Sequence, residues 1–220
     1  MKSGETSDQL KYKVILMMDE KAIDNYLLWE LCKQGGIQEM IMGNSADGGK
    51  LKKEIVEKAK REYQKKDYSF EKKVNLLQEL DSNPEYRSKV FKKHSWSKET
   101  VNVEDLGTTL PRAGDLPPEV ITGTLSGVVE FVKNADPEEY QSVRYIRSLS
   151  EVPEVLNEFL PWVITLGNRP SKRNRLNRVH GEKNWDIEDT WGMINDGNHR
   201  TIAKIIANDS EEIECYVGSS

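Results

Sequence analysis

The chain has 220 residues, of which 36% are hydrophobic and 31% are charged, and its formal net charge is −5 at pH 7. This length allows one large domain or two small ones, and five Trp and eight Tyr argue against wholesale disorder, which is poor in aromatic residues. The acidic balance gives no global attraction to nucleic acid or to an anionic membrane, so any such binding depends on local patches.

The sequence also constrains the compartment and the metal content of the protein. No stretch approaches the roughly 20 continuous apolar residues of a membrane helix, and the first residues lack the apolar core of a secretory signal. Cys32 and Cys215 lie on segments of opposite character, which indicates free thiols in a reducing compartment. Two cysteines and three histidines offer no four-ligand zinc spacing, so no structural metal is expected. The sequence favours a cytoplasmic protein with no membrane partner.

The first part of the chain is expected to be mainly helical. An apolar run of strand length, 12–18, is followed by helical spacing up to Gly35-Gly36, and 37–42 fits either a strand or a helix. A second stripe, on a highly charged helix that begins near residue 50, consists of Leu51, Ile55, Ala59 and Tyr63. Two more helices are predicted, one around residues 74–80 and one from Asn83-Pro84 to near His94. Residues 50–73 carry ten Lys/Arg against five Asp/Glu, which fits either a solvated face of ion pairs or a docking surface.

Residues 96–118 contain several Gly and Pro residues and are predicted to be irregular. We place a domain boundary there, with a mainly helical region over 1–118 and a second domain over 119–220. The second domain opens with a helix over about 120–132, which Gly123 and Gly127 weaken.

The remaining elements alternate in type. The pattern predicts strands at 143–147, 162–166, 191–195 and 212–217. Ser150 is predicted to cap a further helix, another helix is predicted over 199–208, and a polar excursion is predicted over 167–190. This order predicts an α+β fold in which helices pack on a small mixed sheet, preceded by the helical N-terminal region.

One junction in this order has the character of an anion site. Residues Asp196-Gly197-Asn198-His199-Arg200, which we call the anion cradle, lie where an apolar strand turns directly into an amphipathic helix. The first N–H groups of a helix have no intrahelical acceptors, and the helix dipole adds roughly half a positive charge there. Gly197 permits a tight turn and a close approach of phosphate, while His199 and Arg200 add donors. The alternative interpretation is an ordinary Asp-Gly turn capped by Asn198.

The motif resembles the ParB/sulfiredoxin-like superfamily, whose nucleotide-binding sequence has the form (Asp/Gly)-Gly-x-His-Arg-x-x-Ala. The resemblance covers roughly residues 140–220, is close only over Gly197 to Ala203, and extends more loosely to the strand at Pro161-Trp162-Val163-Ile164. It implies that this loop and helix end hold nucleotide phosphates. Sulfiredoxins carry a reactive cysteine where this chain has Asn198. Partition proteins continue into a DNA-binding domain, whereas this sequence ends at Ser220, just after the last predicted strand. The Asp-Gly-x-His-Arg pattern matches the branch of ADP-dependent free-serine kinases, although no catalytic carboxylate can be aligned.

The polar excursion is the second feature that carries charge. It contains the cations Arg169, Lys172, Arg173, Arg175 and Arg178, with His180, and no acid before Glu182. Such a cluster favours a polyanion, either a triphosphate or a nucleic-acid backbone, unless it is a solvated loop paired with the acids that follow it. Those acids, Asp186, Glu188 and Asp189, are an alternative source of magnesium ligands.

These observations predict a protein that binds ATP or ADP, with Mg²⁺, and transfers a phosphoryl group to a small or protein hydroxyl. Asp196 and His199 are the expected catalytic residues, one orienting the acceptor or metal and the other stabilising charge or moving a proton. The expected phosphate-binding residues are Gly197, Asn198, His199, Arg200, Thr201, Arg169, Lys172 and Arg173. A non-catalytic nucleotide- or nucleic-acid-binding module, with nucleic acid held at Arg169–Arg178, is the alternative, and ParB-like nuclease activity is a further one. Deep burial of residues 196–200, or one of the protein's own carboxylates at the helix start, would count against the site.

Overall fold

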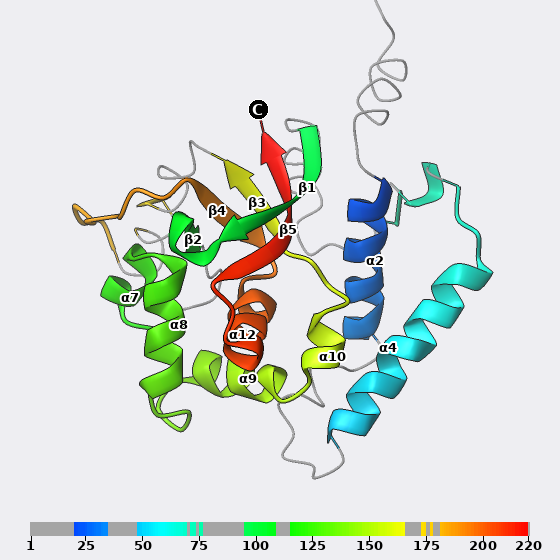
Figure 1. The fold of residues 1–220 in the computed structure, drawn as a ribbon, viewed down its shortest axis with the longest axis horizontal. Helices are drawn as coiled ribbons and strands as arrows, with labels where there is room; N and C mark the ends of the chain where they lie inside the picture. Colours follow the sequence, from blue (N-terminus) through cyan, green and yellow to red (C-terminus); the bar gives the residue numbers. More distant parts are fainter. Residues whose placement is uncertain are drawn as a thin grey trace, which may run out of the picture.

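The computed structural model describes residues 20–34, 48–69, 71–73, 75–76, 95–108, 115–165, 173–174, 177 and 181–219 (Figure 1). The predicted strand at 12–18, the segment 37–42 and the helix ending near His94 lie outside these residues, as does most of the predicted helix around 74–80. None of the described helices combines the length and the apolar character needed to span a bilayer.

The described strands form one five-stranded mixed sheet in the order β1-β5-β3-β4-β2. Their bounds are β1 Ser95–Asn102, β2 Leu106–Thr108, β3 Trp162–Thr165, β4 Gly192–Asp196 and β5 Glu212–Ser219. The pairs β1–β5 and β3–β4 are antiparallel, while β2–β4 and β3–β5 are parallel. The α+β prediction is therefore confirmed, and so are the predicted strands at β3, β4 and β5.

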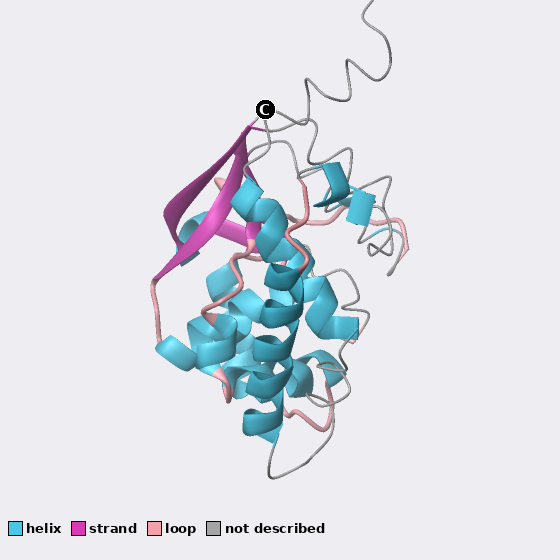
Figure 2. Ribbon diagram, turned by 90° about the vertical axis from the view of Figure 1, so that its right-hand side faces the viewer, coloured by secondary structure: helices cyan, strands magenta, loops and turns pink. Residues whose placement is uncertain are grey.

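Alternation along the strands divides the buried core between the two faces of the sheet. Trp96, Trp162 and Tyr216 belong to one cluster with residues of α2 (Glu20–Gln34), and their strand neighbours Val163 and Val217 belong to the other. In Figure 2 the strands lie at one side of the molecule, and most of the helices lie below and beside them. The sheet is thus covered by helices from both the first and the last parts of the chain.

The second and larger cluster is built with the helices that lie between the strands in the sequence. These are α7 Pro118–Thr122, α8 Leu125–Asn134, α9 Gln141–Ser150, α10 Pro153–Leu156 and α12 Asn198–Asn208. The helix predicted over 120–132 is present but is divided at Gly123 and Thr124, where the Thr124 side chain caps α8. The prediction of α12 is confirmed.

The predicted strand at 143–147 is wrong, because these residues lie within α9. The fully buried side chains of this helix, Val143, Ile146 and Leu149, recur every three residues, which places them on one helical face. Arg147 anchors the helix by donating to the carbonyls of Val132, Lys133 and Ala135 at the end of α8. Ser150 ends α9 instead of capping the next helix.

The predicted irregular segment at 96–118 is also wrong over much of its length, because it contains β1, a 3₁₀ turn at Val103–Asp105, and β2. All eight residues of β1 pair with β5, from Ser95 opposite Ser219 to Asn102 opposite Glu212. The sheet therefore contains residues from both sides of the boundary predicted at 118.

The N-terminal helices α2 and α4 (Gly48–Lys65) agree with prediction and lie side by side in Figure 1. Lys73 joins them to the segment that follows α4, with its Nζ 2.7 Å from carboxylate oxygens of both Glu20 and Asp24. The Tyr63 hydroxyl of α4 also donates to Asp24, at 2.6 Å. This network fixes α4 against α2, and α2 in turn packs on the sheet.

Candidate functional site

The anion cradle begins where β4 turns into α12 without an intervening loop. Gly197 has φ 85° and ψ 18°, the left-handed conformation that residues with a side chain rarely adopt, and it is the N-cap of α12. Its carbonyl accepts hydrogen bonds from the backbone N of Thr201, at 2.8 Å, and from the Thr201 hydroxyl, at 2.9 Å. Because glycine has no side chain, the N-cap residue of α12 offers no side-chain acceptor to the first N–H groups of the helix. The strand-to-helix junction predicted from the sequence is present.

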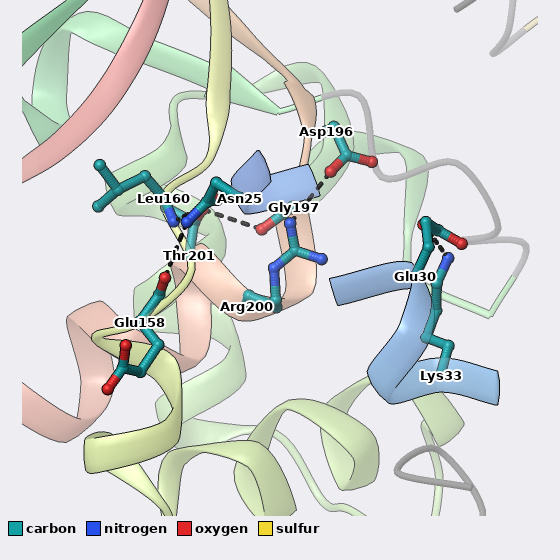
Figure 3. Close-up of polar contacts among 9 residues, drawn as sticks. All are labelled: Asn25, Glu30, Lys33, Glu158, Leu160, Asp196, Gly197, Arg200 and Thr201. Atoms are coloured by element: carbon teal, nitrogen blue, oxygen red, sulfur yellow. Dashed lines mark hydrogen bonds and ion pairs between the residues drawn. The ribbon is translucent and has the colours of Figure 1, made fainter. Parts of the chain in front are cut away.

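Arg200 folds back over this turn instead of extending into solvent (Figure 3). A Cβ placed on Gly197 would lie only 2.9 Å from Nη2 of Arg200. The same Nη2 donates to Oδ2 of Asp196 at 3.0 Å, and the guanidinium carbon lies 4.3 Å from the ring centroid of Trp29. Arg200 is 7% exposed, and its Nε has no hydrogen-bond partner among the described residues. A buried cation is thus placed at the helix start with one donor still unused.

The other motif residues connect the cradle to its surroundings. Asn198 is buried and accepts a hydrogen bond from the Thr108 hydroxyl at the end of β2. His199 is partly exposed and meets the ring of Tyr145, on α9, edge to face with centroids 5.3 Å apart. Thr201 is buried against the Gly197 carbonyl. The structure therefore brings Asp196, Gly197, Asn198, His199, Arg200 and Thr201 together.

The two conditions that would count against the site are met in part. Asn198 and Arg200 are buried, and the carboxylate of Asp196 pairs with Arg200 at this end of the helix. Asp196, Gly197 and His199 remain partly exposed. A ligand therefore has access to the edge of the cradle, and it would meet Arg200 only by competing with Asp196 or by using the remaining donors.

Glu30 is a residue of this site that the sequence analysis did not single out. It lies on α2, is 6% exposed and forms an ion pair with Lys33 (Figure 3). Burial raises the pKa of its carboxyl, the Lys33 cation partly opposes this, the charge of Asp196 raises the pKa further and that of Arg200 lowers it. A signal was present, because Glu30 follows Ile23 and Leu27 at helical spacing and so places a carboxylate on the buried stripe of the helix.

Most of the cationic excursion lies outside the described residues, including Arg169, Lys172, Arg175, Arg178 and His180. Arg173 is described and is exposed, but no contact places it beside the cradle. The acids after the excursion, Asp186, Glu188 and Asp189, are exposed. Within the described part of the chain, no three His, Cys, Asp or Glu residues are grouped so that they could hold a metal ion.

The two cysteines and three of the tryptophans differ in their burial. Cys32 and Cys215 are unpaired and buried, and burial raises the pKa of each thiol to about 12. Trp162 is a core residue and Trp185 is partly buried. Trp191 is 42% exposed and lies just before β4.

Comparison of the chain with family models, with curated proteins and with solved structures gives no match. The function of this chain is therefore inferred from its own geometry and from the motif resemblance described above.

Proposed function

We propose that the amino end of α12 binds the phosphates of a nucleotide, ATP or ADP. The observation that carries this proposal is the position of Arg200, a buried guanidinium whose Nε has no partner among the described residues, beside a left-handed glycine at a helix start. Burying a charged group with unsatisfied donors is costly unless a ligand uses them. A phosphate would supply oxygen acceptors for a planar guanidinium and would favour the positive end of the helix dipole.

The proposed reaction is phosphoryl transfer to the hydroxyl of a small molecule or a protein. Such a transfer depends mainly on positioning and on charge stabilisation, with a carboxylate to orient the hydroxyl or accept its proton. In our proposal Arg200 and the backbone at Gly197–His199 hold phosphate, while His199 stabilises charge or moves a proton. Asp196 orients the acceptor or a Mg²⁺ ion that enters with the nucleotide. The partly exposed positions of Asp196 and His199 support these roles.

Nucleotide binding is tested first by thermal unfolding of the wild-type chain with ATP or ADP and Mg²⁺. We expect a rise in Tm that increases with ligand concentration, because a ligand that binds only the folded state stabilises it by mass action. Arg200→Ala should abolish the rise, and Arg200→Lys, which keeps the charge but loses the planar fork, should reduce it. Arg144→Ala is the matched control, because Arg144 donates to the Pro137 carbonyl and to the Glu138 carboxylate and not to a residue of the cradle. A wild-type chain whose Tm no nucleotide changes would refute the proposal.

Transfer is then followed by the appearance of ADP or AMP when hydroxyl compounds are added. Turnover that depends on the added hydroxyl and is lost in Asp196→Asn or His199→Gln would support the enzyme. Nucleotide binding without any turnover across the acceptors tried would favour the non-catalytic module.

A further inference from the structure

The guanidinium of Arg200 is held by a residue from the N-terminal region of the chain. Trp29 of α2 is 4% exposed, and the guanidinium carbon of Arg200 lies over its ring at 4.3 Å from the centroid. At another edge of the guanidinium, Nη2 meets Asp196 at 3.0 Å. Two groups far apart in the sequence, an aromatic ring and a carboxylate, therefore fix one cation.

Trp29 is itself held in place by the packing of α2. Its ring meets Phe159 with centroids 4.9 Å apart. The side chain of Asn25 donates to the Glu158 carbonyl at 2.8 Å and accepts from the Leu160 backbone N at 3.1 Å, as Figure 3 shows. One turn of α2 is therefore fixed to the segment that leads into β3. The indole ring is a rigid surface against which Arg200 rests.

An aromatic ring suits this task for a chemical reason. The ring face attracts a cation electrostatically without accepting a conventional hydrogen bond, so the N–H donors of the guanidinium remain available for oxygen acceptors. A carboxylate in the same place would compete with phosphate for those donors. Trp29 thus restricts the position of Arg200 while leaving its hydrogen-bonding capacity for a ligand.

We propose that Trp29 is a positioning residue of the nucleotide site, which orients Arg200 toward phosphate and makes the N-terminal helix α2 a necessary part of that site. This inference rests on the proposed function. It assigns to the N-terminal region a part in binding that the motif alone does not indicate.

The test measures the affinity of the full chain for ADP with Mg²⁺ by calorimetry in Trp29→Leu and Trp29→Phe. Leucine keeps an apolar side chain but removes the ring, so we expect about tenfold weaker binding, in the range of a buried cation–π contact. Phenylalanine keeps a ring face with a weaker attraction, so about threefold weaker binding is expected. Trp96→Leu is the matched control, since Trp96 is also buried but packs on Trp162 in a different core cluster from that of Trp29. Its affinity should stay within about twofold of the wild type.

A second measurement does not require nucleotide. The Nε–H resonance of Arg200, identified by its absence from Arg200→Lys, should move when the Trp29 ring is removed and should stay in place in Trp96→Leu. If Trp29→Leu does not fold, the positioning role is tested by the ADP affinity of Trp29→Phe and by the position of the Arg200 Nε–H resonance in that variant. Wild-type affinity in both Trp29 variants, or equal weakening in Trp29→Leu and Trp96→Leu, would overturn the positioning role while the proposed function stands. No ADP binding by the wild-type chain would overturn both.

Discussion

Gly197→Ala is the substitution that best probes the cradle, because two separate costs meet at this residue. Its φ of 85° costs a residue with a Cβ about 1–2 kcal/mol. The new Cβ would also lie 2.9 Å from Nη2 of Arg200 and 3.3 Å from Cα of Pro161. The Pro161 backbone has little room to yield, and Arg200 moves only by disturbing its bond to Asp196. We assign roughly 1–2 kcal/mol to that displacement.

A smaller effect opposes these costs, since alanine restricts the unfolded chain and so stabilises by about 0.4–1 kcal/mol. The expected net loss in the free energy of unfolding is therefore about 2 kcal/mol, measured by urea denaturation followed by circular dichroism. Gly181→Ala is the matched control, because Gly181 has φ 84° but an added Cβ would have no atom of the described residues within 4 Å. It should lose about 1 kcal/mol or less.

The contribution of Arg200 can be separated with the double variant Gly197→Ala/Arg200→Met. Methionine removes the guanidinium, so Gly197→Ala should cost less in this background than in the wild type. Equal losses for Gly197→Ala and Gly181→Ala, together with no coupling to Arg200, would refute the packing of the guanidinium over the turn.

Three further predictions test other parts of the structure. Burial raises the pKa of the Glu30 carboxyl above its ordinary 4.5, so the native state binds the carboxyl proton more tightly than the unfolded chain does. The free energy of unfolding therefore falls as the pH rises from 4.5 to the raised pKa of the native state. Urea unfolding from pH 4 to 7 should therefore show Glu30→Gln gaining on the wild type as pH rises; a constant difference would contradict this. At pH 8, a disulfide reagent should label Cys32 and Cys215 about 1,000-fold more slowly in the native chain than in urea, since burial raises both pKa values to about 12; fast native labelling would count against their burial. A fragment of residues 119–220 lacks β1 and should show no cooperative unfolding by circular dichroism, whereas a cooperative transition would support the predicted boundary.

Local sequence patterns predicted those helices and strands whose apolar residues repeat along the whole element. The stripe through Ile23 and Leu27 predicted α2, and the run through Ile202 and Ile205 predicted α12. The five residues 143–147 were too short a window, because alternation and helical spacing coincide there until Leu149 is included. β1 was missed for a different reason. It is an edge strand whose residues 97–100 are all exposed, so little apolar alternation marks it.

The candidate site shows the same division between local and tertiary information. The turn at Gly197 and the helix after it follow from adjacent residues, and the sequence predicted them. The contact of Trp29 with Arg200 joins positions 171 residues apart, and the burial of Glu30 depends on how α2 docks. No spacing rule connects such positions, since helix docking depends on the packing of the whole sheet face.

The placement of β5 inside the sheet, between β1 and β3, has a consequence for the order of assembly. β5 pairs with β1 on one side and β3 on the other, yet it is the last of the described strands to be synthesised. During translation, β1 and one edge of β3 lack their native neighbour until β5 leaves the ribosome. Long-range pairings of this kind form slowly, and open strand edges invite association with other chains. A nascent copy of this protein is thus most vulnerable to aggregation just before its synthesis reaches β5.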